Sequence, residues 1–200
     1  MYVGATFNII PKLYFSFPIK LVEFLNVNEI NTIYWVPSAM GIVANLKLFD
    51  YAMPKYLNTI LFAGEVMPNK HLNYWRKYLP NAMYANLFGP SETTDICTYY
   101  IVDREFKDDE SLPIGYACEN CRAFVINENG KEVKDIDEVG ELYILSDFVA
   151  RGYYNNEEKT KEAFVQNPLQ NFYPEIVYKT GDLVKCNEQG EFEYVGRRGL

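Results

Sequence analysis

The stretch YANLFGPSETT, residues 84–94, joins an apolar run to a compact polar cluster. The run from Tyr84 to Phe88 has the length and composition of a buried strand, and Gly89-Pro90 is typical of a turn that ends one. Ser91 to Thr94 follow directly and place three hydroxyls around the carboxylate of Glu92. The stretch therefore predicts a strand with a polar loop at its carboxyl end, where open parallel sheets bind their ligands.

The residues before this stretch alternate between β-rich runs and helical periodicity. Pro18 and Pro68 stand where first helical turns begin. Strands that alternate with helices predict βαβ units and a parallel sheet. We expect strands at residues 5–10, 32–36, 59–63 and 83–88, and apolar residues three and four apart predict helices around 21–25, 40–44 and 72–79.

The pattern changes after the charged segment 103–111. Turn signals at Asn127–Gly130 and Asn187–Gly190 flank short alternating strands, and one helix is expected over residues 157–164. The predicted fold class is therefore α/β, with a parallel-sheet α/β subdomain at residues 1–110. A mainly antiparallel β subdomain that resembles a distorted barrel is expected at residues 111–200.

Composition limits the possible partners. The 200 residues carry a formal net charge of -8, and the pI is near 4.8. Nucleic acids and anionic membranes bind clustered Lys and Arg, so neither is an expected partner. No apolar run approaches the roughly 18 residues of a membrane span, and we expect a cytoplasmic protein without membrane insertion. A phosphate-bearing ligand must then be held by local donors or by a metal ion.

The four cysteines predict reduced structural thiols. Cys118 and Cys121 have CxxC spacing, but the chain has no second CxxC and a single histidine, His71, far away in sequence. A structural zinc site needs four ligands, which this spacing does not supply.

Three polar loops are candidates for a binding site. Gly64 follows one strand, Ser91 and Glu92 follow another, and Asp182 follows a glycine in the second half of the chain. Asp182 could accept two hydrogen bonds from a diol such as ribose. Each loop also has a structural explanation: Gly64 as a strand-end turn, Ser91 as a helix cap and Asp182 as an Asx turn.

Seven ordered motifs identify a family resemblance over essentially the whole chain. The chain resembles the adenylate-forming superfamily, and within it the amino-acid adenylation domains of nonribosomal peptide synthetases and the D-alanine–carrier protein ligases. The motifs are AGEVMP (63–68), NLFGPSETT (86–94), LPIG (112–115), GELYI (140–144), ARGY (150–153), YKTGDL (178–183) and YVGR (194–197).

The resemblance implies a two-step ligase that uses ATP and Mg²⁺. A carboxylate attacks the α-phosphate of ATP to form an acyl adenylate and pyrophosphate. The phosphopantetheine thiol of a carrier protein then takes the acyl group and AMP leaves.

The resemblance also implies roles for individual residues. Glu92 would hold Mg²⁺ against the triphosphate, Ser91 would contact the α-phosphate, and Thr93 belongs to the same catalytic cluster. Phe88, usually Tyr in the family, would stack on adenine. The other nucleotide-site residues are Gly64, Asn86 and Gly89, with Asp182 on the ribose and with Tyr194 and Arg197 over the nucleoside.

Substrate choice is implied by the pocket positions Trp35, Leu61, Ala63, Leu87, Asp95 and Ile96. Trp35 would shorten the pocket and favour a small amino acid, with D-alanine ahead of others. Asp95 could pair with a second cation on the substrate or lie at the solvent-exposed rim. An acyl- or aryl-CoA ligase of the same superfamily and a non-catalytic interaction module that retains the fold are the alternatives.

Several family parts are not in these 200 residues. The Gly-rich phosphate loop, the Asp that grips the substrate amine and the C-terminal domain with its catalytic Lys are missing. We therefore expect an excised piece of a longer protein that is inactive alone. Gly199 stands where family members carry the Asp of an interdomain hinge.

Overall fold

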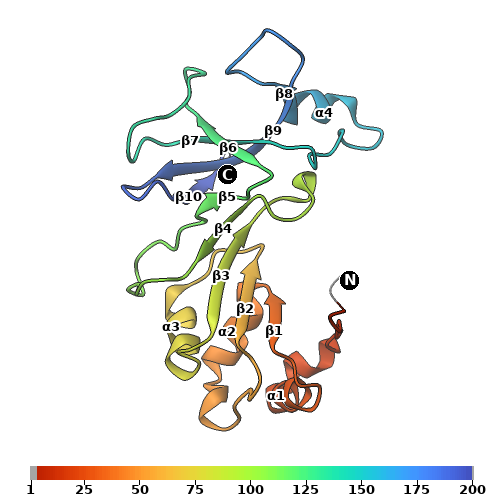
Figure 1. The fold of residues 1–200 in the computed structure, drawn as a ribbon, viewed down its shortest axis with the longest axis vertical. Helices are drawn as coiled ribbons and strands as arrows, with labels where there is room; N and C mark the ends of the chain where they lie inside the picture. The colour runs from red at the N-terminus through yellow and green to blue at the C-terminus, as the bar shows by residue number, and fades with distance from the viewer. Residues whose placement is uncertain (1–3, 200) are drawn as a thin grey trace. The chain divides into compact units, whose positions relative to one another are not determined.

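The structure is a computed structural model that describes residues 4–199. The chain forms two compact units: unit 1 runs up to Tyr84 and includes Phe106–Asp109, and unit 2 comprises Ala85–Glu105 and the residues from Glu110 onward. Strand β3 (Met83–Phe88) carries the chain from unit 1 into unit 2, as Figure 1 allows the reader to follow. Residues 85–105 thus belong to the compact unit of the second half.

Unit 1 is built from helices and parallel strands. Strands β1 and β2 pair in parallel with Thr32 opposite Thr59, and the backbone N–H of Met83 donates to the carbonyl of Asn58 over 2.8 Å. The elements are η1 (Lys12–Ser16), α1 (Pro18–Val27), β1 (Thr32–Trp35), α2 (Pro37–Asn45), η2 (Leu48–Asp50), β2 (Thr59–Ala63), α3 (Asn69–Tyr78) and the start of β3.

Helices α2 and α3 enclose the core of unit 1. Trp75 on α3 is buried, and its indole N–H donates to the carbonyl of Met40 on α2 over 3.0 Å. The ring of Phe49 meets Trp75 edge-on, with centroids 4.8 Å apart. A buried tryptophan usually finds a hydrogen-bond partner for its indole N–H. This hydrogen bond joins α3 to α2 within the core.

Unit 2 is mainly antiparallel. Strand β3 pairs with β4 and β4 with β5, and a second sheet has the order β10-β9-β7-β6 with β8 on β9. The elements are η3 (Ser91–Thr93), β4 (Thr98–Ile101), β5 (Tyr116–Ala117), β6 (Arg122–Ile126), β7 (Gly140–Leu145), α4 (Glu157–Ala163), β8 (Phe164–Gln166), β9 (Ile176–Cys186) and β10 (Phe192–Arg197).

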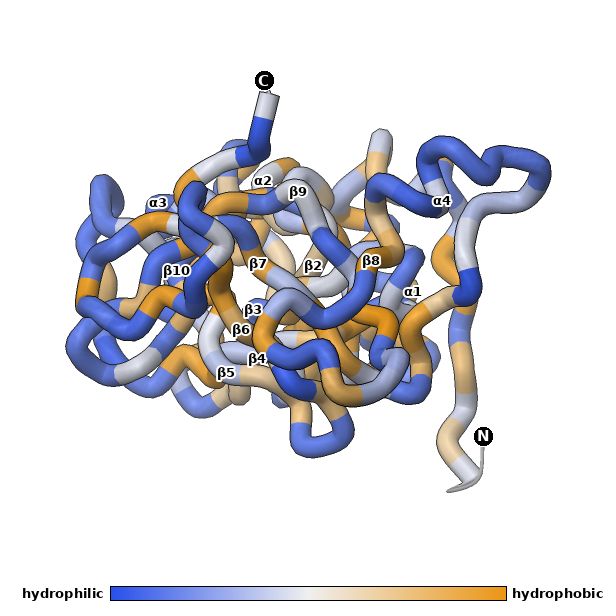
Figure 2. Tube along the Cα trace, turned by 90° about the horizontal axis from the view of Figure 1, so that it is seen from above, coloured by the Kyte–Doolittle hydropathy of each residue, from blue (hydrophilic) through white to orange (hydrophobic). Residues whose placement is uncertain are grey.

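The apolar faces of this second sheet form the core of unit 2. Leu142, Ile144 and Val184 are fully buried there. Helix α4 is different, because it buries no residue and is mostly hydrophilic (Figure 2), with Ala163 at its end packed partly buried against the core. It is therefore a solvated helix whose Asn156 side chain caps the N–H of Lys159 over 3.1 Å.

The predicted fold class, a parallel α/β part followed by a mainly antiparallel β part, is confirmed. Both predicted turns form, with Gly130 and Gly190 each donating back to the asparagine three residues earlier. The strand predicted at residues 5–10 is wrong: residues 4–10 have no regular secondary structure, and a short 3₁₀ helix follows. No helix within residues 4–199 has the length and apolarity needed to cross a membrane.

Candidate functional site

The loop after β3 is folded tightly onto itself. Gly89 packs against the backbone of Asp95, and a Cβ at Gly89 would lie 2.0 Å from the Asp95 carbonyl oxygen. Thr94 and Asp95 both have positive φ, and the N–H of Cys97 returns to the carbonyl of Phe88 over 2.9 Å. Only glycine fits at position 89, so this residue shapes the polar loop through its missing side chain.

The three polar residues of η3 have different surroundings. Thr93 is fully buried, and its hydroxyl donates to the carbonyl of Pro90 over 3.0 Å. Ser91 is exposed and Glu92 is half-buried. The N-cap of η3 is Pro90 and no side chain caps it, so the explanation of Ser91 as a helix cap is wrong. The geometry leaves Ser91 and Glu92 open to a ligand, while Thr93 holds the turn.

Glu92 accepts hydrogen bonds from the loop that follows β7. The phenol of Tyr153 donates to Glu92 Oε1 over 2.6 Å, and the N–H of Ala150 donates to the Glu92 carbonyl over 2.8 Å. Burial, and then the hydrogen bond to Glu92, raise the pKa of Tyr153. Burial, and then the hydrogen bond to Tyr153, raise the pKa of Tyr178 on β9, with the Glu92 charge adding. Both phenols therefore stay protonated at neutral pH and act as donors.

Asp182 and Arg197 are cross-strand neighbours on β9 and β10. Arg197 Nη1 lies 3.8 Å from Asp182 Oδ1, and only 6% of Asp182 is exposed. Burial raises the pKa of Asp182; the charge of Arg197 opposes this shift, and the charges of Glu141 and Glu92 add to it. Glu92 and Asp182 thus lie within electrostatic range of each other, although 90 positions apart in the sequence (182 minus 92).

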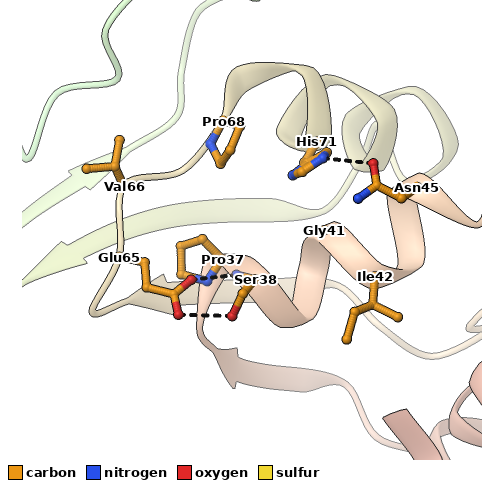
Figure 3. A pocket seen from close by; sticks show the side chains of 9 residues that line it. All are labelled: Pro37, Ser38, Gly41, Ile42, Asn45, Glu65, Val66, Pro68 and His71. Carbon is orange, nitrogen blue, oxygen red and sulfur yellow. Dashed lines mark hydrogen bonds between the residues drawn. The ribbon is translucent and has the colours of Figure 1, made fainter. Parts of the chain in front are cut away.

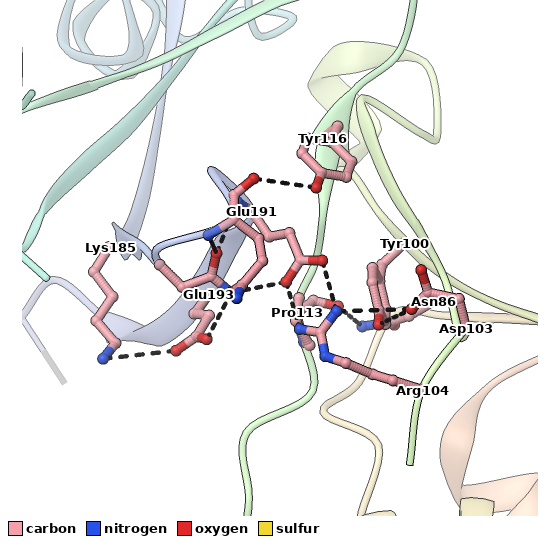
Figure 4. Close-up of polar contacts among 11 residues, drawn as sticks. Asn86, Tyr100, Asp103, Arg104, Pro113, Tyr116, Lys185, Glu191 and Glu193 are labelled. Carbon is pink, nitrogen blue, oxygen red and sulfur yellow. Dashed lines mark hydrogen bonds and ion pairs between the residues drawn. The ribbon is translucent and has the colours of Figure 1, made fainter. Parts of the chain in front are cut away.

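The remaining predicted site residues of unit 2 differ in burial. Asn86 is buried, and its Nδ2 donates to the Pro113 carbonyl over 2.8 Å (Figure 4). Phe88 and Tyr194 are half-buried against the core around Cys97. Leu87 and Ile96 are half-buried and Asp95 is exposed. Asn86 therefore links β3 to the LPIG motif, a structural role in addition to the predicted role in the nucleotide site.

In unit 1 the predicted pocket residues do not share one face of the sheet. Trp35 pairs with Phe62, and side chains alternate along a strand, so Trp35 projects from the face opposite to Leu61 and Ala63. Its ring meets Phe15 and Trp75 edge-on, with centroids 5.4 and 6.1 Å away. Of the pocket positions predicted in unit 1, Leu61 and Ala63 share a face and Trp35 does not.

Val36 is a residue that sequence reasoning missed. It continues the extended backbone of β1, so it follows Tyr34 on the side of Leu61 and Ala63. Val36 is 44% exposed, and a Cβ at Gly64 would lie 3.8 Å from its Cγ1. The alternation of side chains along β1 could have indicated the face on which Val36 lies. Placing Val36 beside Leu61 and Ala63 also requires the register between β1 and β2, which the sequence does not give.

A cavity of about 350 Å³ opens beside the loop that carries Gly64 (Figure 3). Glu65 lies at one side of it: Oε2 accepts the Ser38 N–H over 2.8 Å and Oε1 accepts the Ser38 hydroxyl over 2.9 Å. His71 Nε2 contacts Asn45 Oδ1 at 3.1 Å on the far side. The lining residues are Pro37, Ser38, Gly41, Ile42, Asn45, Glu65, Val66, Pro68 and His71.

The donor set around Glu92 suits Mg²⁺. Within residues 4–199 no three His, Cys, Asp or Glu side chains lie close enough to enclose a metal ion. Magnesium is usually held by one or two carboxylates, with waters and substrate phosphates filling the other positions. A single half-buried carboxylate beside the hydroxyl of Ser91 fits that mode, and Glu92 is the residue that would hold the ion.

Comparison with known proteins agrees with these features. Residues 1–154 match the family described as AMP-binding enzyme. Tyrocidine synthase 3 of Brevibacillus parabrevis is 35% identical over 195 residues, which are 97% of this chain and 3% of that protein.

Two solved structures are also similar. CmiS6 has a TM-score of 0.81 with 29% identity, and the match covers 94% of this chain and 45% of that one. PA1221, described as a nonribosomal peptide synthetase protein containing adenylation and PCP domains, has a TM-score of 0.79 with 25% identity; the match covers 90% of this chain and 35% of PA1221. The chain thus spans less than half of each of these proteins. With more than half of its length matched by the family, the chain belongs to the AMP-binding enzymes.

Proposed function

We propose that the chain contributes to an ATP-dependent ligase that activates an amino acid as its adenylate and passes it to a carrier protein. The family membership and the similarity to a protein described as containing adenylation and PCP domains support this reading. The observation that carries it is the placement of Glu92 and Asp182 on one unit, within electrostatic range. Glu92 would hold Mg²⁺ at the phosphates, and Asp182 would accept hydrogen bonds from the ribose.

The buried carboxylate of Asp182 is suited to a diol. It lies in a site that penalises its charge, so two hydroxyl donors stabilise it more than they would in water. Arg197 on the neighbouring strand holds it within 3.8 Å and offers donors toward the nucleoside. Phe88 supplies a ring face for adenine, since stacking needs the ring and not the hydroxyl that Tyr would add.

The reaction is a displacement at phosphorus. A carboxylate oxygen of the substrate bonds to the α-phosphorus of ATP while the bond to the bridging oxygen breaks and pyrophosphate leaves. Mg²⁺, when bound, offsets the charge of the triphosphate and of the departing pyrophosphate. Ser91, exposed in the same loop, would donate to an α-phosphate oxygen, and Glu92 accepts a hydrogen bond from Tyr153.

A small amino acid is the proposed substrate, with D-alanine favoured. In unit 1, Leu61, Ala63 and Val36 share one face of the sheet. The phosphopantetheine thiol of a carrier protein is the proposed acceptor, and the cytoplasm is the proposed location.

Amino-acid-dependent exchange of pyrophosphate into ATP tests this function in the complete gene product. D-alanine, L-alanine, glycine, lysine, acetate and benzoate form the substrate panel. We expect exchange with a small amino acid and none with the two plain carboxylates. Exchange with acetate or benzoate alone would assign an acyl- or aryl-CoA ligase instead, and no exchange with any substrate would favour a non-catalytic module.

A further inference from the structure

The ARGY motif has no role in the proposed chemistry, yet it binds the polar loop directly. The loop that contains it, residues 146–156, meets the β3–β4 loop through three hydrogen bonds. Tyr153 Oη donates to Glu92 Oε1 over 2.6 Å, Ala150 N donates to the Glu92 carbonyl over 2.8 Å, and Thr94 Oγ1 donates to the Phe148 carbonyl over 2.8 Å. Glu92 is thus held at its backbone and at its side chain.

Tyr153 is itself fixed by α4 and its flanking residues. Its N–H donates to Thr160 Oγ1 over 2.9 Å, and Thr160 Oγ1 donates to the Asn156 carbonyl over 2.7 Å. Its ring meets Phe164 edge-on with centroids 5.5 Å apart. A Cβ at Gly152 would lie 2.4 Å from Thr160 Cγ2, so the backbone approaches α4 as closely as glycine allows.

A second phenol completes the arrangement. Tyr178 is 3% exposed, and burial, with smaller contributions from Tyr153 and Glu92, raises the pKa of its phenol. The hydrogen bond from Tyr153 to Glu92 has a charged acceptor, and such a bond is about twice as strong as a neutral one. Tyr153 therefore restricts the orientation of the Glu92 carboxylate.

We propose that Tyr153 is a positioning residue that orients Glu92 toward Mg²⁺ and the triphosphate. The inference rests on the proposed function, because it needs Glu92 to hold the ion. Partners that hydrogen-bond a metal-binding side chain fix its direction, and their loss typically weakens metal affinity by 10- to 100-fold. Tyr153 acts on the reaction through Glu92 and touches no reacting atom.

The test measures Mn²⁺ binding by electron paramagnetic resonance, with the complete gene product and a non-hydrolysable ATP analogue. Tyr153→Phe keeps the ring against Phe164 and removes only the hydroxyl. We expect it to weaken Mn²⁺ binding by about tenfold. AMP affinity measured by calorimetry should stay unchanged. In exchange assays kcat should fall while the KM for the amino acid does not change.

Two further variants make the outcome decisive. Tyr154→Phe is the matched control, because Tyr154 is 94% exposed, and it should behave as the wild type. Glu92→Gln should lose Mn²⁺ binding. If Glu92→Gln loses it and Tyr153→Phe does not, the positioning role is overturned while the proposed function stands. If neither substitution changes Mn²⁺ binding, both the metal role of Glu92 and this inference are overturned.

Discussion

The guanidinium of Arg104 and the carboxylate of Glu191 form a two-pronged ion pair, with nitrogen–oxygen distances of 2.8 and 2.6 Å (Figure 4). Glu191 is 3% exposed and also accepts a hydrogen bond from Asn187 over 2.7 Å. The Arg104 guanidinium lies 5.2 Å from the ring centroid of Tyr100. The pair ties the segment after β4 to the β9–β10 turn, next to the strand that carries Arg197.

Arg104→Gln should destabilise the protein. Loss of the guanidinium leaves a buried carboxylate without its counter-charge, although part of the cost is screened because 39% of the Arg104 side chain is exposed. We expect the free energy of unfolding in urea to fall by about 2 kcal/mol. Arg122→Gln, which breaks an exposed 3.7 Å contact with Glu132, is the control and should cost less than about 0.5 kcal/mol. Equal losses in the two variants would contradict this account.

The same pair should give a pH-dependent contribution to stability. The hydrogen bond from Arg104, against the opposing effect of burial, lowers the pKa of Glu191 below its ordinary 4.5. A carboxyl group whose pKa is lowered in the folded state stabilises that state above the unfolded pKa, and it loses this contribution as pH falls through the folded pKa. The stability gap between wild type and Arg104→Gln should therefore narrow from pH 7 toward about pH 3. A gap that widens toward acid would have the wrong sign.

Asp182→Asn should stabilise the protein while weakening nucleotide binding. Burial raises the pKa of Asp182 above its ordinary 3.8, so the ionised form costs the folded state stability at neutral pH. We expect a higher thermal midpoint at pH 7 and a difference that disappears below about pH 3.8. AMP affinity should fall by at least about tenfold, because a charged acceptor is replaced by a neutral amide. A lower midpoint at pH 7 would show that the contact with Arg197 outweighs the burial.

Glu65→Ala should loosen the start of α2. No side chain caps this helix from its own N-cap, and Glu65 instead takes the N–H and the hydroxyl of Ser38 (Figure 3). A carboxylate at a helix N-terminus contributes about 1 kcal/mol. We expect a loss of that size in Glu65→Ala and a non-additive double-mutant cycle with Ser38→Ala. Glu23→Ala, at an exposed position on α1, should have little effect, and an additive cycle would remove Glu65 from this role.

Local sequence signals predicted much of this structure. The apolar runs at 59–63 and 83–88 are strands, the turn at Asn187–Gly190 joins β9 to β10, and the turn at Asn127–Gly130 follows β6, because each signal is complete within a few residues. Residues 5–10 have a β-rich composition, but composition alone does not make a strand, which also needs hydrogen-bonding neighbours. The short strands β5 and β8 lie below the length at which periodicity can be read.

The sequence did not predict the features of the site that depend on strand register or on contacts between distant residues. The motifs pointed to Glu92 and Asp182 as candidates. They did not predict the hydrogen bond between Tyr153 and Glu92, which lie 61 positions apart, since hydrogen bonds between distant loops leave no pattern in one sequence. Trp35 was expected beside Leu61, yet the β1–β2 register pairs it with Phe62 and turns it to the other face. A shift of one residue in register exchanges the faces of a strand, so this assignment requires the structure.

Calorimetry of AMP binding to the complete gene product, in the wild type and in Asp182→Ala, tests the central claim most directly. The account predicts measurable binding that Asp182→Ala weakens at least about tenfold, because the ribose loses its charged acceptor. Glu92→Ala, the companion variant, should bind AMP as the wild type does but bind magnesium–ATP more weakly. Wild-type and Asp182→Ala proteins with equal AMP affinity would contradict the assignment of a nucleotide site to this carboxylate.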